Sequence, residues 1–388
     1  MRKWLKRIGM ALGLLLVVAI ALGLWKREEV SRLLAVNSLF AEDRIVSNFS
    51  HMNTLFHSVT MRGGDAVPFD QGPAANFPNG YAQWLEDRHV TGVVILGNGA
   101  LQHEEYRLGT TRDDLRISWS VAKSALSMLL GILHEEGVIP DLDAPVTEFA
   151  RDLRGSAYDG ATIRQVLRMS SGVAFDEDYL DFWSDINRMG RVLALGGSMD
   201  GFAAGQSARA GAPGETWRYV SIDTHVLSMV IRGATGRTIA ELMEEKLFRP
   251  IGLESDPYYV TDGHGVAFVL GGLNMTTRDY ARLGQLVLQD GVWQGRQIVG
   301  ADWLAESTVA SAPGGVGYGY QWWIPPGAEP GEVYARGVYG QFIWIDRARG
   351  VVIAINSADR QFRDPGVMDD NIAMMRAIAR LNAQPGQE

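Results

Sequence analysis

The sequence predicts an α+β fold in which one antiparallel sheet is built from both ends of the chain, is flanked by helices, and contains an inserted, mainly helical lobe. Two observations carry this prediction. Apolar runs bounded by turn residues occur over 90–109 and again over 318–356, whereas helical apolar periodicity predominates between 120 and 310. Strands separated in this way meet most simply in one sheet that is covered by the intervening helices.

The expected strands are marked by their turns. Residues 90–109 contain Asn98-Gly99, the residue pair that favours a two-residue hairpin. Further strands are expected over 318–324, 340–346 and 350–356, and a turn at 347–350 joins the last two. Helices are expected over 120–136, 161–169, 222–235, 238–247, 276–290 and 369–382.

The first 27 residues are expected to form a membrane anchor or signal segment. A basic cluster precedes an uncharged run over residues 8–25, and 18 helical residues rise about 27 Å, close to the thickness of a bilayer's hydrocarbon core. The basic cluster should stay in the cytoplasm, which predicts a protein of the bacterial cell envelope, anchored in the inner membrane with its bulk on the periplasmic side. Small residues at 19–21 leave cleavage and secretion as the alternative.

The rest of the chain divides into two parts. Residues 28–80 show no sustained period and include a stretch rich in glycine and proline, so they are expected to be a tether and a loop-rich approach. Residues 81–388 are expected to form the folded domain. Composition agrees with a globular protein, since 46% of the residues are hydrophobic and 21% are charged.

Charge and composition exclude several classes of function. The formal net charge is −9, and it falls to −15 without the six basic residues of the first 27. Such an acidic chain repels phosphate backbones, so no nucleic-acid partner is expected. There is no cysteine, and the seven histidines lack ligand spacing. No metal or other cofactor is therefore expected, and the oligomeric state is left open.

Ser120 and Lys123 form the candidate catalytic pair. They lie three residues apart at the start of an apolar helix, so both side chains share one face and the amine can reach the hydroxyl. Beyond the first 27 residues the chain has only one other lysine, Lys246, and otherwise uses arginine for positive charge. Arginine cannot lose its proton, whereas a desolvated lysine can act as a base. The alternative is an ordinary surface lysine whose ammonium reaches solvent.

"SVAK" (120–123) resembles the S-x-x-K motif of the serine β-lactamase and penicillin-binding-protein superfamily. The segments 161–175, 211–253 and 270–291 are similar to the class C-like branch, in the same order along the chain. The resemblance is greatest to the 6-aminohexanoate-dimer hydrolases and family VIII carboxylesterases, and it covers roughly residues 90–380. It implies the β-lactamase/transpeptidase-like fold and a serine nucleophile that forms an acyl-enzyme.

The resemblance also implies further site residues. The family's Tyr-x-Asn motif falls on Tyr219 and Ser221, with serine in place of asparagine, and the tyrosine would complete a proton relay with Lys123. A nearby cation is expected to lower the pKa of this phenol. The family's Lys-Thr-Gly motif is missing, and Arg336-Gly337 is its nearest counterpart. The backbone N–H of Val338 would then form the oxyanion hole with that of Ser120, and the small Gly337 would let substrate approach.

Two groups of aromatic residues are further candidates. Tyr179 matches a tyrosine that contacts the scissile amide in the linear-amide hydrolases of this branch, although an acidic surface loop is an equally simple interpretation. Trp183, Trp322 and Trp323 are candidates for an apolar acyl pocket or for ordinary aromatic core.

The sequence thus predicts a serine hydrolase whose partner is a small-molecule ester or amide substrate. A D-alanyl peptidase or β-lactamase is the alternative within hydrolases, and the missing Lys-Thr-Gly counts against it. An envelope binding protein without activity is the alternative outside them. The natural substrate does not follow from fold and site chemistry.

Overall fold

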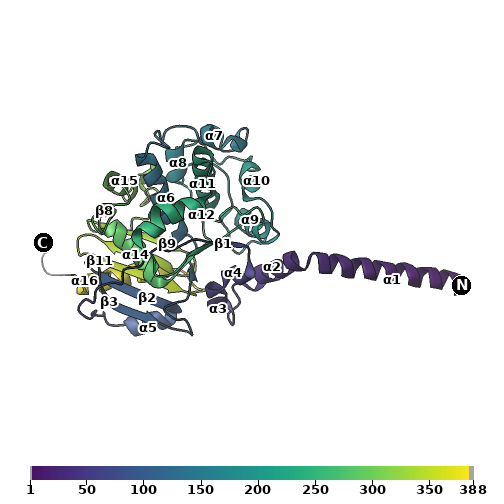
Figure 1. Ribbon diagram of the computed structural model, residues 1–388, viewed down its shortest axis with the longest axis horizontal. Helices are drawn as coiled ribbons and strands as arrows, with labels where there is room; N and C mark the ends of the chain where they lie inside the picture. The colour runs from purple at the N-terminus through teal and green to yellow at the C-terminus, as the bar shows by residue number, and fades with distance from the viewer. Residues whose placement is uncertain (1, 384–388) are drawn as a thin grey trace.

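The computed structural model describes residues 2–383, except that the side chains of residues 2, 3, 18–20, 22 and 24 lie outside the described set. A five-stranded antiparallel sheet forms its centre, in the order β3-β2-β11-β10-β9 (Figure 1). Its strands are β2 (Val90–Gly97), β3 (Ala100–Tyr106), β9 (Glu332–Gly337), β10 (Gln341–Asp346) and β11 (Val351–Ser357). Because β2 pairs with β11, the sheet joins the two parts of the chain as predicted, which confirms the expected fold class.

The turn chemistry explains the hairpins. Asn98 and Gly99 both adopt positive φ, at 48° and 86°, as the tight turn between β2 and β3 requires. Residues 318–324, by contrast, form no continuous strand. Gln321 adopts φ of 65° and reverses the chain, so Tyr318 and Trp323 bridge each other instead.

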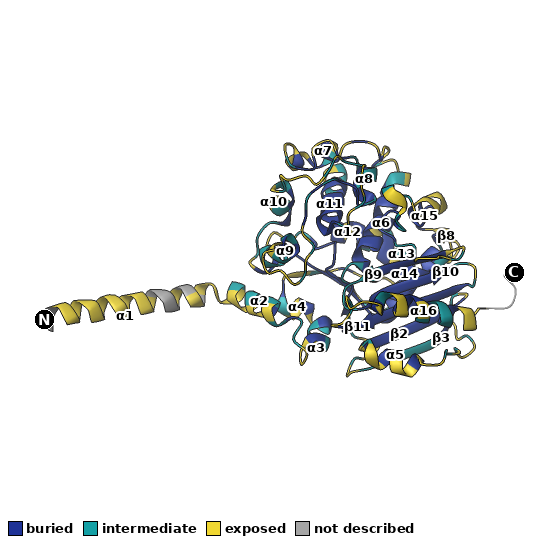
Figure 2. Cartoon of the chain, turned by 180° about the vertical axis from the view of Figure 1, so that it is seen from behind, coloured by how far each residue is buried: buried dark blue, intermediate teal, exposed yellow. Residues whose placement is uncertain are grey.

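Helices cover both faces of the sheet (Figure 2). One face packs against α14 (Thr277–Leu288), and the other against α5 (Tyr81–Asp87) and α16 (Val367–Leu381). The inserted lobe contains α6 (Val121–Glu135), α7 (Val146–Phe149), α8 (Ile163–Leu167), α9 (Asp185–Ala194), α10 (Met199–Ala204), α11 (Ser221–Thr235), α12 (Ile239–Met243), α13 (Arg249–Ile251) and α15 (Ala301–Ser307). Short turns of 3-10 helix (Arg151–Leu153, Pro313–Gly315) and π helix (Glu244–Phe248) join them.

Residues 27–60, here called the N-terminal segment, are folded against the domain. They contain α2 (Arg27–Ser38), α3 (Ile45–Ser50), α4 (Met52–Leu55) and β1 (Ser58–Thr60). β1 pairs with β5 (Tyr258–Val260) at the edge of a second sheet, ordered β1-β5-β6-β4 with β6 (Leu273–Met275) and β4 (Arg116–Ile117). A two-stranded ribbon, β7 (Val292–Trp293) with β8 (Arg296–Gln297), lies apart. The part of the chain expected to be a tether therefore has regular structure up to residue 60.

The structure corrects the expected membrane anchor over residues 8–25. These residues belong to α1 (Arg2–Trp25), which projects from the body in Figure 1. Among the described residues, however, no helix has both the length and the apolar character needed to cross a bilayer. The predicted inner-membrane localisation is therefore wrong, and the expected lipid partner is not supported.

Candidate active site

Ser120 lies at the N-terminus of α6, directly after a strained turn. The preceding Trp119 has φ of 43°, which is uncommon for a residue with a side chain and favours an inference of function. Ser120 is the N-cap of the helix, its side chain is partly exposed, and its backbone N–H donates no hydrogen bond to any other described residue. The N-terminal end of a helix carries free N–H groups and partial positive charge, so this serine is placed beside an anion-stabilising position.

Lys123 lies one turn into α6, inside the core. The helix is buried from Val121 to Leu133, and the lysine is only 1% exposed. Its Nζ lies 2.9 Å from Ser120 Oγ, 2.9 Å from the carbonyl oxygen of Leu270 and 3.3 Å from Ser221 Oγ. A neutral amine has two hydrogens and one lone pair, so at this position it can donate to Leu270 and Ser221 while its lone pair accepts the Ser120 proton.

Burial lowers the pKa of Lys123 to about 7, because the charged form loses its hydration in the core. The nearby carboxyl group of Glu177 opposes this shift. A substantial fraction of the lysine is therefore uncharged at neutral pH. The apolar surroundings that the sequence indicated are present, and the structure provides no ion pair to Lys123 among the described residues.

Tyr219 lies beside this amine. Lys123 Nζ is 5.2 Å from the centre of the tyrosine ring, and the ring stacks on Trp323 with centroids 5.5 Å apart. Burial raises the pKa of Tyr219, although a side-chain hydrogen bond with Ser120 opposes the rise. The expectation that a cation would lower this pKa is wrong, because loss of hydration outweighs the neighbouring charges. The phenol therefore keeps its proton at neutral pH.

Glu177 is a residue at this site that the sequence did not single out. The backbone N–H of Ser221 donates to Glu177 Oε1, and the hydroxyl of Tyr179 donates to Glu177 Oε2 at 3.2 Å. Burial raises the pKa of Glu177, and its nearness to Lys123 opposes that rise. Its only signal in the sequence is its position two residues before Tyr179. The structure thus connects Tyr179 and Ser221 through one carboxyl group.

The end of β9 packs directly on the nucleophile turn. A Cβ atom added to Gly337 would lie 2.5 Å from the carbonyl oxygen of Ser118 and 3.0 Å from the backbone nitrogen of Ser120. The glycine therefore permits close contact between two backbones, whereas its small size was expected to let substrate approach. The next residue, Val338, donates no backbone N–H to another described residue, and Tyr339 follows with φ of 60°.

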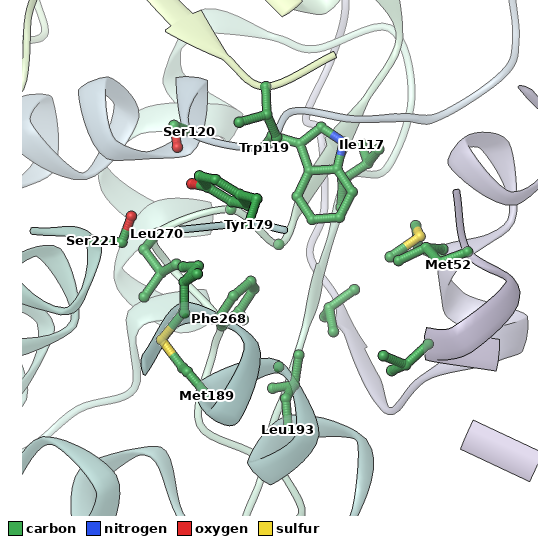
Figure 3. A pocket seen from close by; sticks show the side chains of 18 of the residues that line it. Met52, Ile117, Trp119, Ser120, Tyr179, Met189, Leu193, Ser221, Phe268 and Leu270 are labelled. Carbon is green, nitrogen blue, oxygen red and sulfur yellow. The ribbon is translucent and has the colours of Figure 1, made fainter. Parts of the chain in front are cut away.

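Two cavities meet at Ser120, Tyr179 and Val338, which line both of them. The first has a volume of about 130 Å³ and an apolar wall that contains Met52, Met189, Leu193, Phe268 and Leu270 (Figure 3). The second has a volume of about 360 Å³ and a mixed wall that includes charged side chains, and it is called the polar cavity below. Its charged or ionisable lining side chains are Glu177, Tyr179, Tyr219, Arg336, Arg363 and Asp364. The nucleophile thus lies between a cavity without charged side chains and a cavity that contains them.

The predicted tryptophans do not line the apolar cavity. Trp322 is fully buried in the core, Trp183 is 74% exposed, and Trp323 stacks between Tyr219 and the guanidinium of Arg336, which lies 4.2 Å from its ring centre. The aromatic wall instead contains Phe40 and Phe56 of the N-terminal segment, which spacing along the sequence does not relate to Ser120. Within residues 2–383, no cluster of three or more acidic or histidine side chains is arranged to hold a metal ion.

Comparisons with known proteins agree with this geometry. The Beta-lactamase family profile matches residues 82–374. The 6-aminohexanoate-dimer hydrolase of Paenarthrobacter ureafaciens is 32% identical over 295 residues, which cover 71% of this chain and 74% of that protein. A 6-aminohexanoate-dimer hydrolase homologue from Bacillus anthracis superposes with a TM-score of 0.79 at 25% identity, covering 90% of this chain and 97% of that one. A penicillin-binding protein homologue from Pyrococcus abyssi, at 19% identity, shares the fold with a TM-score of 0.58, covering 76% and 75%.

Proposed function

The chain belongs to the β-lactamase family and is a serine hydrolase of amides or esters, and we propose that it acts through an acyl-enzyme on Ser120. The observation that carries this proposal is the contact between a buried lysine amine and the serine hydroxyl, 2.9 Å apart. We further propose that residues 81–388 form the hydrolase domain.

The first step is attack on the carbonyl carbon. Lys123, uncharged in the reactive form, takes the proton of Ser120 as Oγ bonds to the carbon, and the carbonyl π electrons move to its oxygen. The backbone N–H groups of Ser120 and Val338 would stabilise that oxyanion, and neither is used elsewhere among the described residues. Each such donor is worth about a hundredfold or more in rate.

The second step is departure of the leaving group. The C–O or C–N bond breaks, the oxyanion re-forms the carbonyl, and Tyr219 gives its proton to the departing oxygen or nitrogen. The proton on Lys123 then replaces the one that Tyr219 has lost. Water attacks the acyl-enzyme through the reverse transfers, which restore the Ser120 hydroxyl and release a carboxylic acid. The opposite pKa shifts support these roles, since the amine is poised as a base and the phenol remains an acid.

Labelling of Ser120 tests this proposal. A fluorophosphonate should add to the wild-type chain, and Ser120→Ala should lose both the label and activity by orders of magnitude. Ser127→Ala is the matched control, because Ser127 is a buried serine of the same helix whose hydroxyl has no partner among the described residues. Intact mass spectrometry measures the label, and a p-nitrophenyl ester, a linear anilide and nitrocefin measure the activity. Labelling of Ser120→Ala at the wild-type rate would refute the assignment, and exclusive hydrolysis of nitrocefin would favour the β-lactamase alternative.

A further inference from the structure

We propose that residues 36–56 of the N-terminal segment form the selectivity wall of the acyl site, and that this wall selects compact, uncharged acyl groups. The inference rests on the proposed acyl-enzyme at Ser120 and adds the substrate class. Five side chains from this segment line the apolar cavity, in company with residues of α9 and of the loop before β6. They are Val36, Leu39, Phe40, Met52 and Phe56.

The position of Tyr219 indicates which cavity receives the leaving group and which receives the acyl group. The leaving group must depart toward the acid that protonates it, and Tyr219 lines the polar cavity but not the apolar one. The acyl group, which stays bonded to Ser120 Oγ, is therefore directed into the apolar cavity. Alcohol or amine leaving groups occupy the polar side, where Arg336 and Arg363 lie.

The chemistry of the apolar wall defines the acyl group. None of the described side chains that line this cavity carries a charge. The Nδ2 group of Asn187 is already used, because it donates to the backbone carbonyls of Tyr179 and Asp181 at 3.1 and 2.7 Å. A charged group placed here would lose its hydration without gaining a partner of opposite charge, so the site favours an uncharged acyl chain.

The size of the cavity limits the length of that chain. A volume of about 130 Å³ is close to that of cavities known to bind one benzene molecule. We therefore infer acyl groups of about four to six carbons, or a single aromatic ring. Longer chains would have to displace the wall.

The wall is held firmly against the domain. Arg116, which is 2% exposed, donates from one guanidinium nitrogen to the carbonyl oxygen of Val46 and to Ser50 Oγ, both at 2.6 Å. The backbone N–H of Asn53 donates to the hydroxyl of Tyr258 at 3.3 Å, and β1 then pairs with β5. Met52, 3% exposed, lies on this wall across the cavity from Met189 and Leu193 of α9 (Figure 3).

Substitution of Met52 tests the inference. Met52→Ala lengthens the cavity and should raise kcat/KM for a p-nitrophenyl octanoate relative to the butanoate by about tenfold, whereas Met52→Phe shortens it and should lower that ratio. The ratio of two substrates does not depend on how much of each variant is folded. Met61→Ala is the matched control, because Met61 is a buried methionine, 1% exposed, that does not line the cavity. It should keep the wild-type ratio.

A second comparison tests the charge. Hexanoyl and 6-aminohexanoyl 4-nitroanilides differ by one ammonium, and the hexanoyl compound should be cleaved at least tenfold faster. An unchanged octanoate-to-butanoate ratio in both Met52 variants, or preference for the charged anilide, would overturn the inference while leaving the acyl-enzyme in place. A response of the Met52 variants to the alcohol portion rather than the acyl portion would also overturn it. Absence of both turnover and fluorophosphonate labelling in the wild type would instead refute the proposed function.

Discussion

At the scale of single residues, the site separates the pKa values of a base and an acid that lie side by side. Lys123 has a pKa lowered to about 7 because the core cannot hydrate its charge, and the same loss of hydration raises the pKa of Tyr219. One physical cause thus acts in opposite directions on a cationic acid and a neutral acid. Activity that requires the neutral amine and the protonated phenol should rise through about pH 7 and stay high well above it.

The charge of Glu177 should set the position of this rise. Its carboxylate favours the ammonium form of Lys123, so Glu177→Gln should lower the pKa of the lysine and move the acidic limb of kcat/KM to lower pH. The measurement is a pH profile with a neutral p-nitrophenyl ester. Asp176→Asn, which removes a charge from the same loop at an exposed position, serves as the control and should leave the limb in place.

If the acidic limb of the kcat/KM profile keeps its midpoint or moves to higher pH in Glu177→Gln, the carboxylate of Glu177 does not favour the ammonium form of Lys123. A purely structural role for Glu177, through its bonds to Ser221 and Tyr179, would reduce the height of the profile without moving its midpoint. The two roles are therefore separable in one experiment.

The sequence predicted some residues of the site and missed others. Ser120 and Lys123 are accessible to sequence reasoning because three residues of helix fix their separation, and the family resemblance located Tyr219. The carbonyl group of Leu270 accepts a hydrogen bond from Lys123, and the charge of Glu177 acts on the same amine. The fold brings both near the lysine, and no local spacing encodes either. The downward shift expected for the Tyr219 pKa failed for a related reason, since burial is a property of the folded chain.

At the scale of elements, two strained turns carry the proposed oxyanion donors. Trp119 precedes Ser120, Tyr339 follows Val338, and both have positive φ. Aromatic side chains of the N-terminal segment hold this pair: Phe49 lies 5.5 Å from each of the two rings, and Phe40 stacks on Tyr339 at 4.7 Å. Such backbone strain persists only where packing over-determines it.

Loosening this packing should therefore affect turnover more than binding. Phe49, which is fully buried and does not line either cavity, is the test position. Phe49→Leu should lower kcat about tenfold with a smaller change in KM, because small displacements of the donors weaken oxyanion stabilisation. Phe248→Leu removes a ring of equal burial in the helical lobe and provides the control.

The comparison uses kcat normalised by fluorophosphonate titration, so that only folded, reactive molecules are counted. Phe49→Leu and Phe248→Leu could lose the same amount in melting temperature and also have the same kcat. In that case the aromatic contacts of Phe49 contribute to stability alone.

Helices and hairpins with strong local sequence signals were predicted well, whereas elements with weak local signals were not predicted. The hairpins at 98–99 and 347–350 and the helices α6, α11, α14 and α16 follow from turn residues and from apolar periodicity. The helices of residues 45–55 are too short to show a period, and tertiary contacts such as those of Phe49 fix them.

At the scale of the whole molecule, the sheet that joins both chain ends brings β9 against the start of α6, although they are more than 200 residues apart in sequence. The sequence predicted this arrangement through its order of strands and helices. It could not predict that the N-terminal segment completes the site, because that depends on how the segment folds onto β4, β5 and α9.

Burial of a lysine in this core must also affect the stability of the whole chain. Its pKa is about 7 in the folded protein against an ordinary value of 10.5, so between these values the unfolded chain binds a proton that the folded chain lacks. The free energy of unfolding contributed by this group therefore rises with pH across that window and is lowest below pH 7. At most, the slope is about 1.4 kcal/mol per pH unit.

Lys123→Met removes this titration while filling much of the same volume. The variant also loses donors to Leu270 and Ser221, but that loss does not depend on pH in the same way. The stability of Lys123→Met minus that of the wild type should therefore decrease steadily from pH 7 to pH 9, whatever its value at pH 7. Urea unfolding at several pH values measures the difference, and Ser127→Ala, which removes no titratable group, should run parallel to the wild type. A pH-independent difference for Lys123→Met would mean that the lysine keeps its ordinary pKa in the fold, and the base assigned to Ser120 would then be charged at neutral pH.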